Sequence, residues 1–163
     1  MGNTFYFAWE PALMHWLQIH MSTLATGLAS LITLFGEELV MVVVLGYVYW
    51  CHDKNMGIYL GTNFCMAGLW NPMLKNVFMR RRPYFDHPQI QCLKPVHHGA
   101  DIYDIHIQGF SFPSGHSSNA ATVYGSIARF SQKRVVTAAA VVITLLVGCS
   151  RFCLGVHYPT DVL

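Results

Sequence analysis

The sequence predicts an integral-membrane helical bundle of about five to six transmembrane helices. Hydrophobic residues make up 53% of the chain and charged residues only 11%, against about 25% charged residues in a typical soluble domain. Apolar segments of helical length recur between short polar stretches, as in a chain that crosses lipid several times. The chain has 163 residues and no internal repeat, so we expect a single domain over residues 1–163.

The first two expected helices lie before residue 51. Residues 7–35 mix apolar and polar side chains, so we expect an interfacial amphipathic stretch that runs into a first membrane helix. Glu37 and Glu38 then mark a boundary with water. The next helix, Leu39–Trp50, would span only about 18 Å, whereas the hydrocarbon layer is roughly 30 Å thick. We therefore expect it to extend at its ends or to cross a thinned region.

The third expected helix, Met56–Phe78, is long enough to span. Pro72 lies inside it and removes one backbone hydrogen bond, so we expect a kink close to Lys75. A lysine near the membrane is costly unless it faces the interior of the bundle or reaches water. Either position suits a side chain that binds phosphate.

A polar segment, residues 84–112, joins this helix to the second half of the chain. Its length makes it a candidate lid over a site and a candidate determinant of substrate choice. Six of its histidines and aspartates could also be counted as a metal site, although their spacing matches no familiar zinc pattern. They are His87, His97, His98, Asp101, Asp104 and His106. We favour the solvated lid over the metal site.

Two more helices are expected beyond this segment. Residues 117–130 are rich in small side chains that let helices approach closely, and residues 135–149 are strongly apolar. The chain stops at Leu163, two residues after Asp161, where a sixth helix would begin with Pro159 in its first turn. We therefore expect a final helix that is cut short.

Three short stretches carry residue types that suit phosphate chemistry. In Ser150–Asp161, an arginine, a histidine and a carboxylate stand where an apolar run ends. His157 and Asp161 are four residues apart and would share one face of the helix that Pro159 begins. The carboxylate could fix the tautomer of the imidazole and leave its far nitrogen free as a nucleophile or base. A structural His–Asp pair is the alternative.

The other two stretches lie earlier in the chain. Pro113–His116 precedes the small-residue helix, so its N–H groups and the Ser114 hydroxyl are expected at a helix N-terminus, where anions bind. Lys75 and Arg82 are seven residues apart, about two helical turns, and are expected to project from one helix face. The alternatives are an ordinary helix cap for the former stretch and a basic stop at a membrane surface for the latter.

In this order along one chain, the three stretches resemble the signature motifs of the type 2 phosphatidic acid phosphatase superfamily, which are K-x6-R-P, P-S-G-H and S-R-x5-H-x3-D. That superfamily also includes vanadium-dependent haloperoxidases and glucose-6-phosphatase. The resemblance runs from Lys75 to Asp161, a little over half of the chain, and every signature position is filled. It implies an all-α fold and hydrolysis of phosphoesters through a phosphohistidine, with neither a metal nor another cofactor.

The resemblance also implies a role for each motif residue. His157 would attack phosphorus, Asp161 would orient His157, and His116 would protonate the leaving oxygen and then activate water. The remaining motif residues would bind the phosphoryl group, three as cations and two through a hydroxyl and a backbone N–H. They are Lys75, Arg82, Arg151, Ser114 and Gly115. Arg80 and Arg81 fall outside the pattern, which leaves open lipid headgroups, a second phosphate or plain interfacial anchoring.

The function predicted in this way is that of a membrane-bound phosphatase that hydrolyses a lipid phosphate or pyrophosphate monoester. Its expected partners are the lipid phosphate and membrane lipids, and no nucleic-acid footprint is visible. The particular lipid and the oligomeric state stay open. The alternatives are a non-catalytic membrane protein that retains the fold and, less favoured because those enzymes are soluble, an oxidase of the haloperoxidase type.

If each expected helix crosses the membrane once, the end of the third, the start of the fourth and the end of the fifth lie on the same side. All three motifs are then on that side of the membrane. The opposite side is flanked by basic residues, namely Lys54, Arg129, Lys133 and Arg134. By the positive-inside rule, this favours a site on the extracytoplasmic face of the cell membrane.

Overall fold

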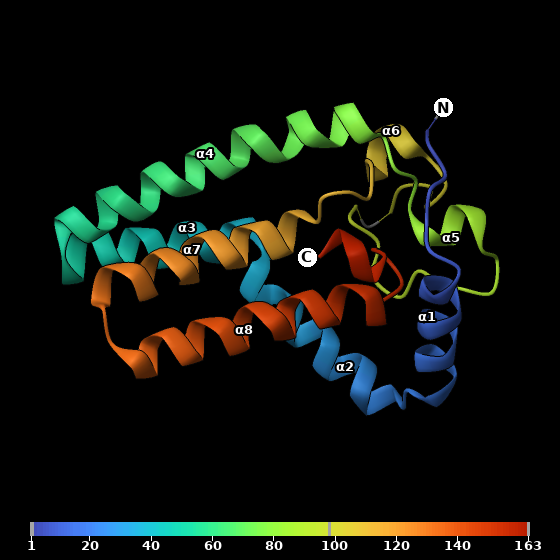
Figure 1. The fold of residues 1–163 in the computed structure, drawn as a ribbon, viewed down its shortest axis with the longest axis horizontal. Helices are drawn as coiled ribbons and strands as arrows, with labels where there is room; N and C mark the ends of the chain where they lie inside the picture. Colours follow the sequence, from blue (N-terminus) through green and yellow to red (C-terminus); the bar gives the residue numbers. More distant parts are fainter. Residues whose placement is uncertain (1, 98, 163) are drawn as a thin grey trace.

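The computed structural model describes residues 2–97 and 99–162 and shows a bundle of helices (Figure 1). In chain order the α-helices are α1 (Trp9–His20), α2 (Thr23–Ile32), α3 (Glu38–Tyr47), α4 (Lys54–Phe78), α5 (Pro83–Asp86), α6 (Ile105–Gln108), α7 (Gly115–Ser131) and α8 (Arg134–Cys153). Shorter segments of other pitch are the 3-10 helices η1 (Thr33–Gly36) and η3 (Pro159–Asp161) and the π-helix η2 (Val48–His52). Extended pairing within the described residues is limited to one isolated bridge, Asn3 to Arg80. The expected all-α class is confirmed.

One described helix, α8, is both long and apolar enough to cross a membrane, with a mean hydropathy of 2.0 over an 18-residue window within its 20 residues. The first two helices pass the same test only when α1 is joined to the segment Thr23–Gly36, and that pair is bent by 120°. Five to six crossings therefore remain a prediction.

The stretch expected over residues 7–35 is divided by this bend. Ser22 lies at the break and caps α2, because its hydroxyl accepts a hydrogen bond from the Ala25 N–H at 3.2 Å. In Figure 1, α1 lies across one end of the bundle while α2 leads into it.

The second expected helix, Leu39–Trp50, is part of a longer helical stretch. The π-helix η2 continues α3, so the helical stretch runs over Glu38–His52. Asp53 then caps α4, and its carboxylate accepts a hydrogen bond from the Met56 N–H at 2.7 Å. The chain folds back tightly at this point, because a Cβ on Gly57 would lie 2.6 Å from the Tyr49 Cα.

Most of the core lies between α3, α4, α7 and α8. Its buried members are Met41, Val48, Met56, Leu60, Ala120, Val123 and Val147. Two asparagines of α4 pair with serines of α7. The Asn63 amide donates to the Ser126 hydroxyl at 2.9 Å, and the Asn71 amide donates to the Ser118 hydroxyl at 3.0 Å. These bonds fix α4 against α7 along their length.

This packing decides where the three motifs lie. The end of α4, the start of α7 and the end of α8 gather at the same end of the bundle, next to α1 (Figure 1). The expectation that the three motifs can meet is confirmed.

Candidate active site

The first motif does not lie on one helix face, so that prediction was wrong. α4 ends at Phe78, and Met79 takes a left-handed backbone with a φ of 48°. Arg82 is extended, with a φ of −73° and a ψ of 152°, because a following proline disfavours the helical region. Lys75 therefore reaches the site from the last turn of α4, where its Nζ donates to the Phe110 carbonyl at 2.7 Å.

Arg82 ties the polar segment to the loop that carries His157. Its Nη2 donates to the Gln108 carbonyl at 2.7 Å, and its Nη1 donates to the Val156 carbonyl at 3.0 Å. Its Nε lies 3.1 Å from the same Gln108 oxygen. A guanidinium has five N–H donors, so these bonds leave Arg82 with donors for a ligand.

Arg151 lies in the last turn of α8 and is buried beside η1. Its Nη1 donates to the Thr33 hydroxyl at 2.8 Å. Its Nε is buried with no hydrogen-bond partner among the described residues. Leaving a buried charged donor unpaired is costly, and an anion bound at this position would remove that cost.

The second motif forms a helix N-terminus, as predicted. Ser114 is the N-cap of α7, and its hydroxyl accepts hydrogen bonds from the Ser117 N–H at 3.4 Å and the Ser117 hydroxyl at 3.2 Å. Gly115 and His116 are the first two helical residues. A Cβ on Gly115 would meet only the Asn71 Oδ1, at 3.9 Å, within 4 Å. The backbone at the start of α7 is therefore open to a close approach.

The third motif brings His157 and Asp161 together, but not on one helix. His157 precedes η3, and Asp161 is the last residue of that short turn. The Asp161 carboxylate folds back to accept a hydrogen bond from the Tyr158 N–H at 2.7 Å, in a capping box. This places Asp161 Oδ2 3.6 Å from His157 Nδ1. Leu163 lies outside the described residues.

Ser111 completes this pair and was not predicted from the sequence. Its hydroxyl donates to Asp161 Oδ2 and lies 3.3 Å from His157 Nδ1. Because that hydroxyl proton is used on Asp161, the serine oxygen offers only lone pairs to the ring. His157 then carries its proton on Nδ1 and keeps a lone pair on Nε2. The only sequence signal for Ser111 is its position two residues before Pro113.

The surroundings of His157 favour its neutral form. The side chain is buried, and burial lowers its pKa well below the usual value. The charges of Arg82, Arg151 and Lys75 lower this pKa further. A neutral imidazole with a free Nε2 is a competent nucleophile.

Arg80 is buried, so contact with lipid headgroups and interfacial anchoring were wrong predictions for this residue. Only 2% of its side chain is exposed, and its Nη1 donates to Asp161 Oδ1 at 2.6 Å. Its Nη2 donates to Glu10 Oε2 at 2.9 Å. The neighbouring Arg81 is 37% exposed and pairs with Asp86 at 3.1 Å. No sequence pattern distinguished these two arginines, and none selected Glu10.

The histidines and aspartates of the polar segment are the remaining candidate residues, as a possible metal site. Within residues 2–97 and 99–162, no three His, Cys, Asp or Glu side chains are grouped so as to hold a metal ion. His98 lies outside the described residues. Asp101 and Asp104 instead accept hydrogen bonds from the backbone N–H groups of Tyr103 and His106, both at 2.9 Å. The two aspartates therefore have a structural role in the segment.

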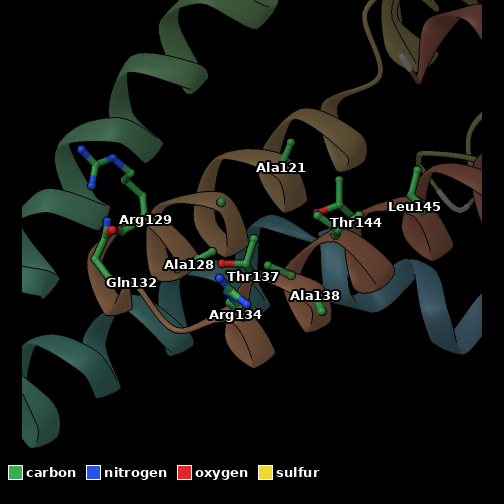
Figure 2. A pocket seen from close by; sticks show the side chains of 12 residues that line it. Ala121, Ala128, Arg129, Gln132, Arg134, Thr137, Ala138, Thr144 and Leu145 are labelled. Atoms are coloured by element: carbon green, nitrogen blue, oxygen red, sulfur yellow. The ribbon is translucent and has the colours of Figure 1, made fainter.

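A large groove lies away from the motifs, between α7 and α8 near the turn that joins them (Figure 2). Its volume is about 790 Å³, and small side chains such as Ala121 and Ala138 line it. Arg129 and Arg134 also line it. None of the motif residues contributes to the groove, so we do not assign it to the site.

This fold and this arrangement of motif residues define a class of protein. A sequence profile of the PAP2 superfamily matches residues 56–163. The chain belongs to this superfamily, and the expected relationship is confirmed.

Particular relatives are named phosphatases. The chain is 37% identical over 133 residues to phosphatidylglycerophosphatase B of Bacillus subtilis, which covers 76% of this chain and 58% of that protein. It is 31% identical over 118 residues to lipid A 1-phosphatase of Rhizobium etli, covering 72% and 45%. It is 33% identical over 106 residues to an undecaprenyl-diphosphatase of Bacillus subtilis, covering 65% and 48%. The chain thus spans about half the length of these relatives.

Solved structures share the fold. The crystal structure of a transmembrane PAP2 type phosphatidylglycerolphosphate phosphatase from Bacillus subtilis matches with a TM-score of 0.73 and 30% identity, covering 93% of this chain and 74% of that chain. Aquifex aeolicus LpxE matches with a TM-score of 0.73 and 20% identity, covering 96% and 87%, and this second match concerns the fold alone. Together with α8, the relatives support a membrane protein.

Proposed function

We propose that this chain is a membrane phosphatase that hydrolyses a lipid phosphate or pyrophosphate monoester through a phosphohistidine, without a metal ion. One observation carries the proposal. The buried His157 presents Nδ1 to Ser111 and Asp161, which leaves Nε2 free among the cations that lower its pKa. A phosphate monoester carries about −1.5 to −2 charges at neutral pH, and three cations in the site would attract it.

In the proposed first step, Nε2 of His157 attacks phosphorus and the bond to the leaving oxygen breaks. Lys75, Arg82 and Arg151 stabilise the charge that spreads over the other phosphoryl oxygens in the transition state. The unpaired Nε of Arg151 and the unused donors of Arg82 support this assignment. The hydroxyl of Ser114 and the N–H of Gly115 add neutral donors at the start of α7.

His116 serves both steps in this proposal. It first gives a proton to the leaving oxygen as a general acid. It then takes a proton from the water that attacks the phosphohistidine, which releases phosphate and restores His157. Its place in the first turn of α7, next to Gly115, supports a role beside the phosphoryl group.

We infer the substrate class from the relatives and from the position of the site. The names of the relatives share a phosphate or diphosphate carried by a lipid. The site lies at one end of the bundle, beside α1, where a headgroup could reach it while an apolar tail stays in the membrane. We propose that this end faces the extracytoplasmic side of the cell membrane.

Phosphate release by the purified protein tests this function. Detergent micelles that contain phosphatidate, phosphatidylglycerophosphate or a polyprenyl diphosphate should yield inorganic phosphate with the wild-type chain, and His157→Ala should yield none. EDTA should leave turnover unchanged, because three basic side chains replace a divalent ion. Loss of turnover with EDTA that zinc or magnesium restores would instead support a metal site. A wild-type chain that releases no phosphate would favour the non-catalytic alternative.

A further inference from the structure

Arg80 lies where three parts of the chain meet. Its Nε donates to the Phe5 carbonyl at 2.8 Å, its Nη1 donates to the Asp161 carboxylate, and its Nη2 donates to the Glu10 carboxylate. The guanidinium also stacks over Tyr158, with 4.2 Å between its central carbon and the ring centroid. A planar guanidinium with this many partners is held in one orientation.

Glu10 joins the same network from α1 and is fully buried. Its Oε1 accepts hydrogen bonds from the Thr160 N–H at 3.1 Å and the Thr160 hydroxyl at 2.6 Å. Its Oε2 accepts hydrogen bonds from Arg80 at 2.9 Å and the Phe7 N–H at 2.8 Å. Glu10 therefore contacts both Arg80 and the turn η3 that ends in Asp161.

The first residues of the chain are held against the region that follows α4. The Asn3 N–H donates to the Met79 carbonyl at 2.8 Å, and the Arg81 N–H donates to the Asn3 carbonyl at 3.0 Å. The Asn3 amide also donates to the Phe78 carbonyl at 2.9 Å. These bonds hold the N-terminal segment, and with it Glu10, beside the site. Glu10 lies outside residues 56–163, the part of the chain that matches the family profile.

We propose that Arg80 and Glu10 are positioning residues that hold Asp161, and through it His157, in the geometry needed for phosphoryl transfer. The inference rests on the proposed function of His157 and Asp161. Asp161 Oδ2 faces Ser111 and His157, and Oδ1 binds Arg80. Contacts at both oxygens fix the rotation of the carboxylate, so it stays aimed at His157 Nδ1.

Removing Arg80 would change both the charge and the orientation of Asp161. Burial raises the pKa of Asp161, and the Arg80 guanidinium acts against that rise. Without Arg80, Oδ1 would lose its charged partner inside the protein. The carboxyl group could then take up a proton and rotate. The Ser111 hydroxyl proton would no longer be committed to Asp161, so Ser111 could donate to His157 Nδ1 and the ring proton could move to Nε2.

Arg81 provides a matched control. It is the next residue in the chain and carries the same charge, but it is partly exposed and pairs with Asp86. Neither residue belongs to the site proposed above. Arg81→Gln therefore removes one positive charge near the site without disturbing Asp161.

The test compares Arg80→Gln, Arg80→Lys, Glu10→Gln and Arg81→Gln in the full chain. For turnover of micellar lipid phosphate, we expect Arg80→Gln and Glu10→Gln to lower kcat by about 10- to 100-fold with KM little changed. The phosphate-binding cations remain in place in these variants, so the value of KM should change little. Arg80→Lys keeps the charge and should recover part of the loss. Arg81→Gln should stay close to wild type.

A second readout does not depend on turnover. Nitrogen-15 NMR of histidine-labelled protein reports which ring nitrogen carries the proton, and the His157 signal is the one missing in His157→Asn. We expect an Nδ1–H ring in wild type and in Arg81→Gln, and a mixture of tautomers in Arg80→Gln. A wild-type chain that shows this tautomer but releases no phosphate would count against the proposed function alone.

Three results would overturn the inference itself. One is an unchanged His157 tautomer together with an unchanged kcat in Arg80→Gln. The second is an equal loss of kcat in Arg80→Gln and Arg81→Gln, which would point to overall charge. The third is a rise in KM without a fall in kcat, which would make Arg80 a substrate-binding residue. If Arg80→Gln does not fold, the nearly isosteric Glu10→Gln decides the question by the same criteria.

Discussion

The two motif histidines lie in different environments. His157 is buried, and its Nδ1 faces Ser111 and Asp161. His116 is only partly buried and sits in the first turn of α7. A ring fixed from one side suits a nucleophile, and the proposed function assigns proton transfer to the other ring. The distinction can be tested with substrates whose leaving groups differ.

His157→Ala should abolish turnover of every substrate, because the covalent route itself is lost. His116→Ala should cost about 100- to 10,000-fold on a lipid phosphate, whose alkoxide needs a proton to leave. With nitrophenyl phosphate, His116→Ala should form the phosphoenzyme at a nearly normal rate and then accumulate it, because the activation of water is impaired.

Rapid-quench trapping with labelled substrate measures this intermediate as acid-labile, base-stable label. The label should be present in His116→Ala and absent in His157→Ala. Label that persists without His157, or equal rescue of both variants by nitrophenyl phosphate, would show that these roles are wrong.

The pH dependence of stability follows from the depressed pKa of His157. Below about pH 6.5 an unfolded chain binds a proton at this residue, whereas the folded chain does not. The unfolded state therefore binds more protons, and folding stability falls as the pH drops below this value. The contribution of one residue reaches at most about 1.4 kcal/mol per pH unit.

Thermal unfolding in detergent between pH 7 and pH 5 measures this effect. The loss of Tm on acidification should be smaller in His157→Asn than in wild type. His20→Asn serves as the control, since His20 is exposed and bonds only within its own helix. An equal acid-dependent loss of Tm in wild type and in His157→Asn would contradict the prediction.

Among the elements, the turn between α8 and η3 depends on one glycine. Gly155 has a φ of 78°, and a Cβ there would lie 2.1 Å from the Gln91 carbonyl oxygen. Left-handed backbone costs a residue with a side chain about 1–2 kcal/mol, and the clash with backbone adds to that. The turn carries Val156 and His157, so strain there displaces both the Arg82 contact and the proposed nucleophile.

Gly155→Ala should therefore lower the free energy of unfolding by at least about 1–2 kcal/mol and should also reduce kcat. Gly68→Ala is the matched control, because Gly68 lies within α4 and a Cβ there meets nothing within 4 Å. That change should be neutral or stabilising by up to about 1 kcal/mol. Melting curves and phosphate release on the two variants give both quantities. A Gly155→Ala variant as stable and active as Gly68→Ala would show that the turn tolerates a side chain.

At the scale of the whole molecule, the two ends of the bundle carry different sets of residues. The end formed by the close of α4, the start of α7 and the close of α8 carries the motif residues. The other end carries basic side chains that include Arg129 and Arg134. The extracytoplasmic placement of the motif end is a proposal, and native and introduced cysteines can test it.

Cys51 is exposed and lies just before α4, at the end away from the motifs. Tyr103 is 58% exposed in the polar segment at the motif end, so Tyr103→Cys adds a reporter there. In intact cells, an impermeant thiol reagent should label Tyr103→Cys, and Cys51 should react only after the membrane is opened. Mass spectrometry of labelled peptides separates the two positions. The opposite order of labelling would reverse the proposed topology.

The sequence by itself determined those features that depend on nearby residues. The cap at Ser114 follows from a serine directly before a helix-forming stretch, and the helix α8 follows from an unbroken apolar run. The motif residues could be selected because their types and order are chemically specific. These local signals predicted the all-α class and the meeting of the three motifs at one end of the bundle.

Only the tertiary structure decided how the site is held together. The bonds from Arg80 to Glu10 and Asp161 join positions 70 and 81 residues apart, and Ser111 reaches Asp161 over 50 residues. Helical periodicity describes neighbours within a few turns, so it contains no information on such contacts. The three consecutive arginines have the same charge and the same side chain, so the sequence does not show which of them is buried. Packing against α1 and η3 buries Arg80, whereas Arg81, the next residue and also an arginine, remains partly exposed.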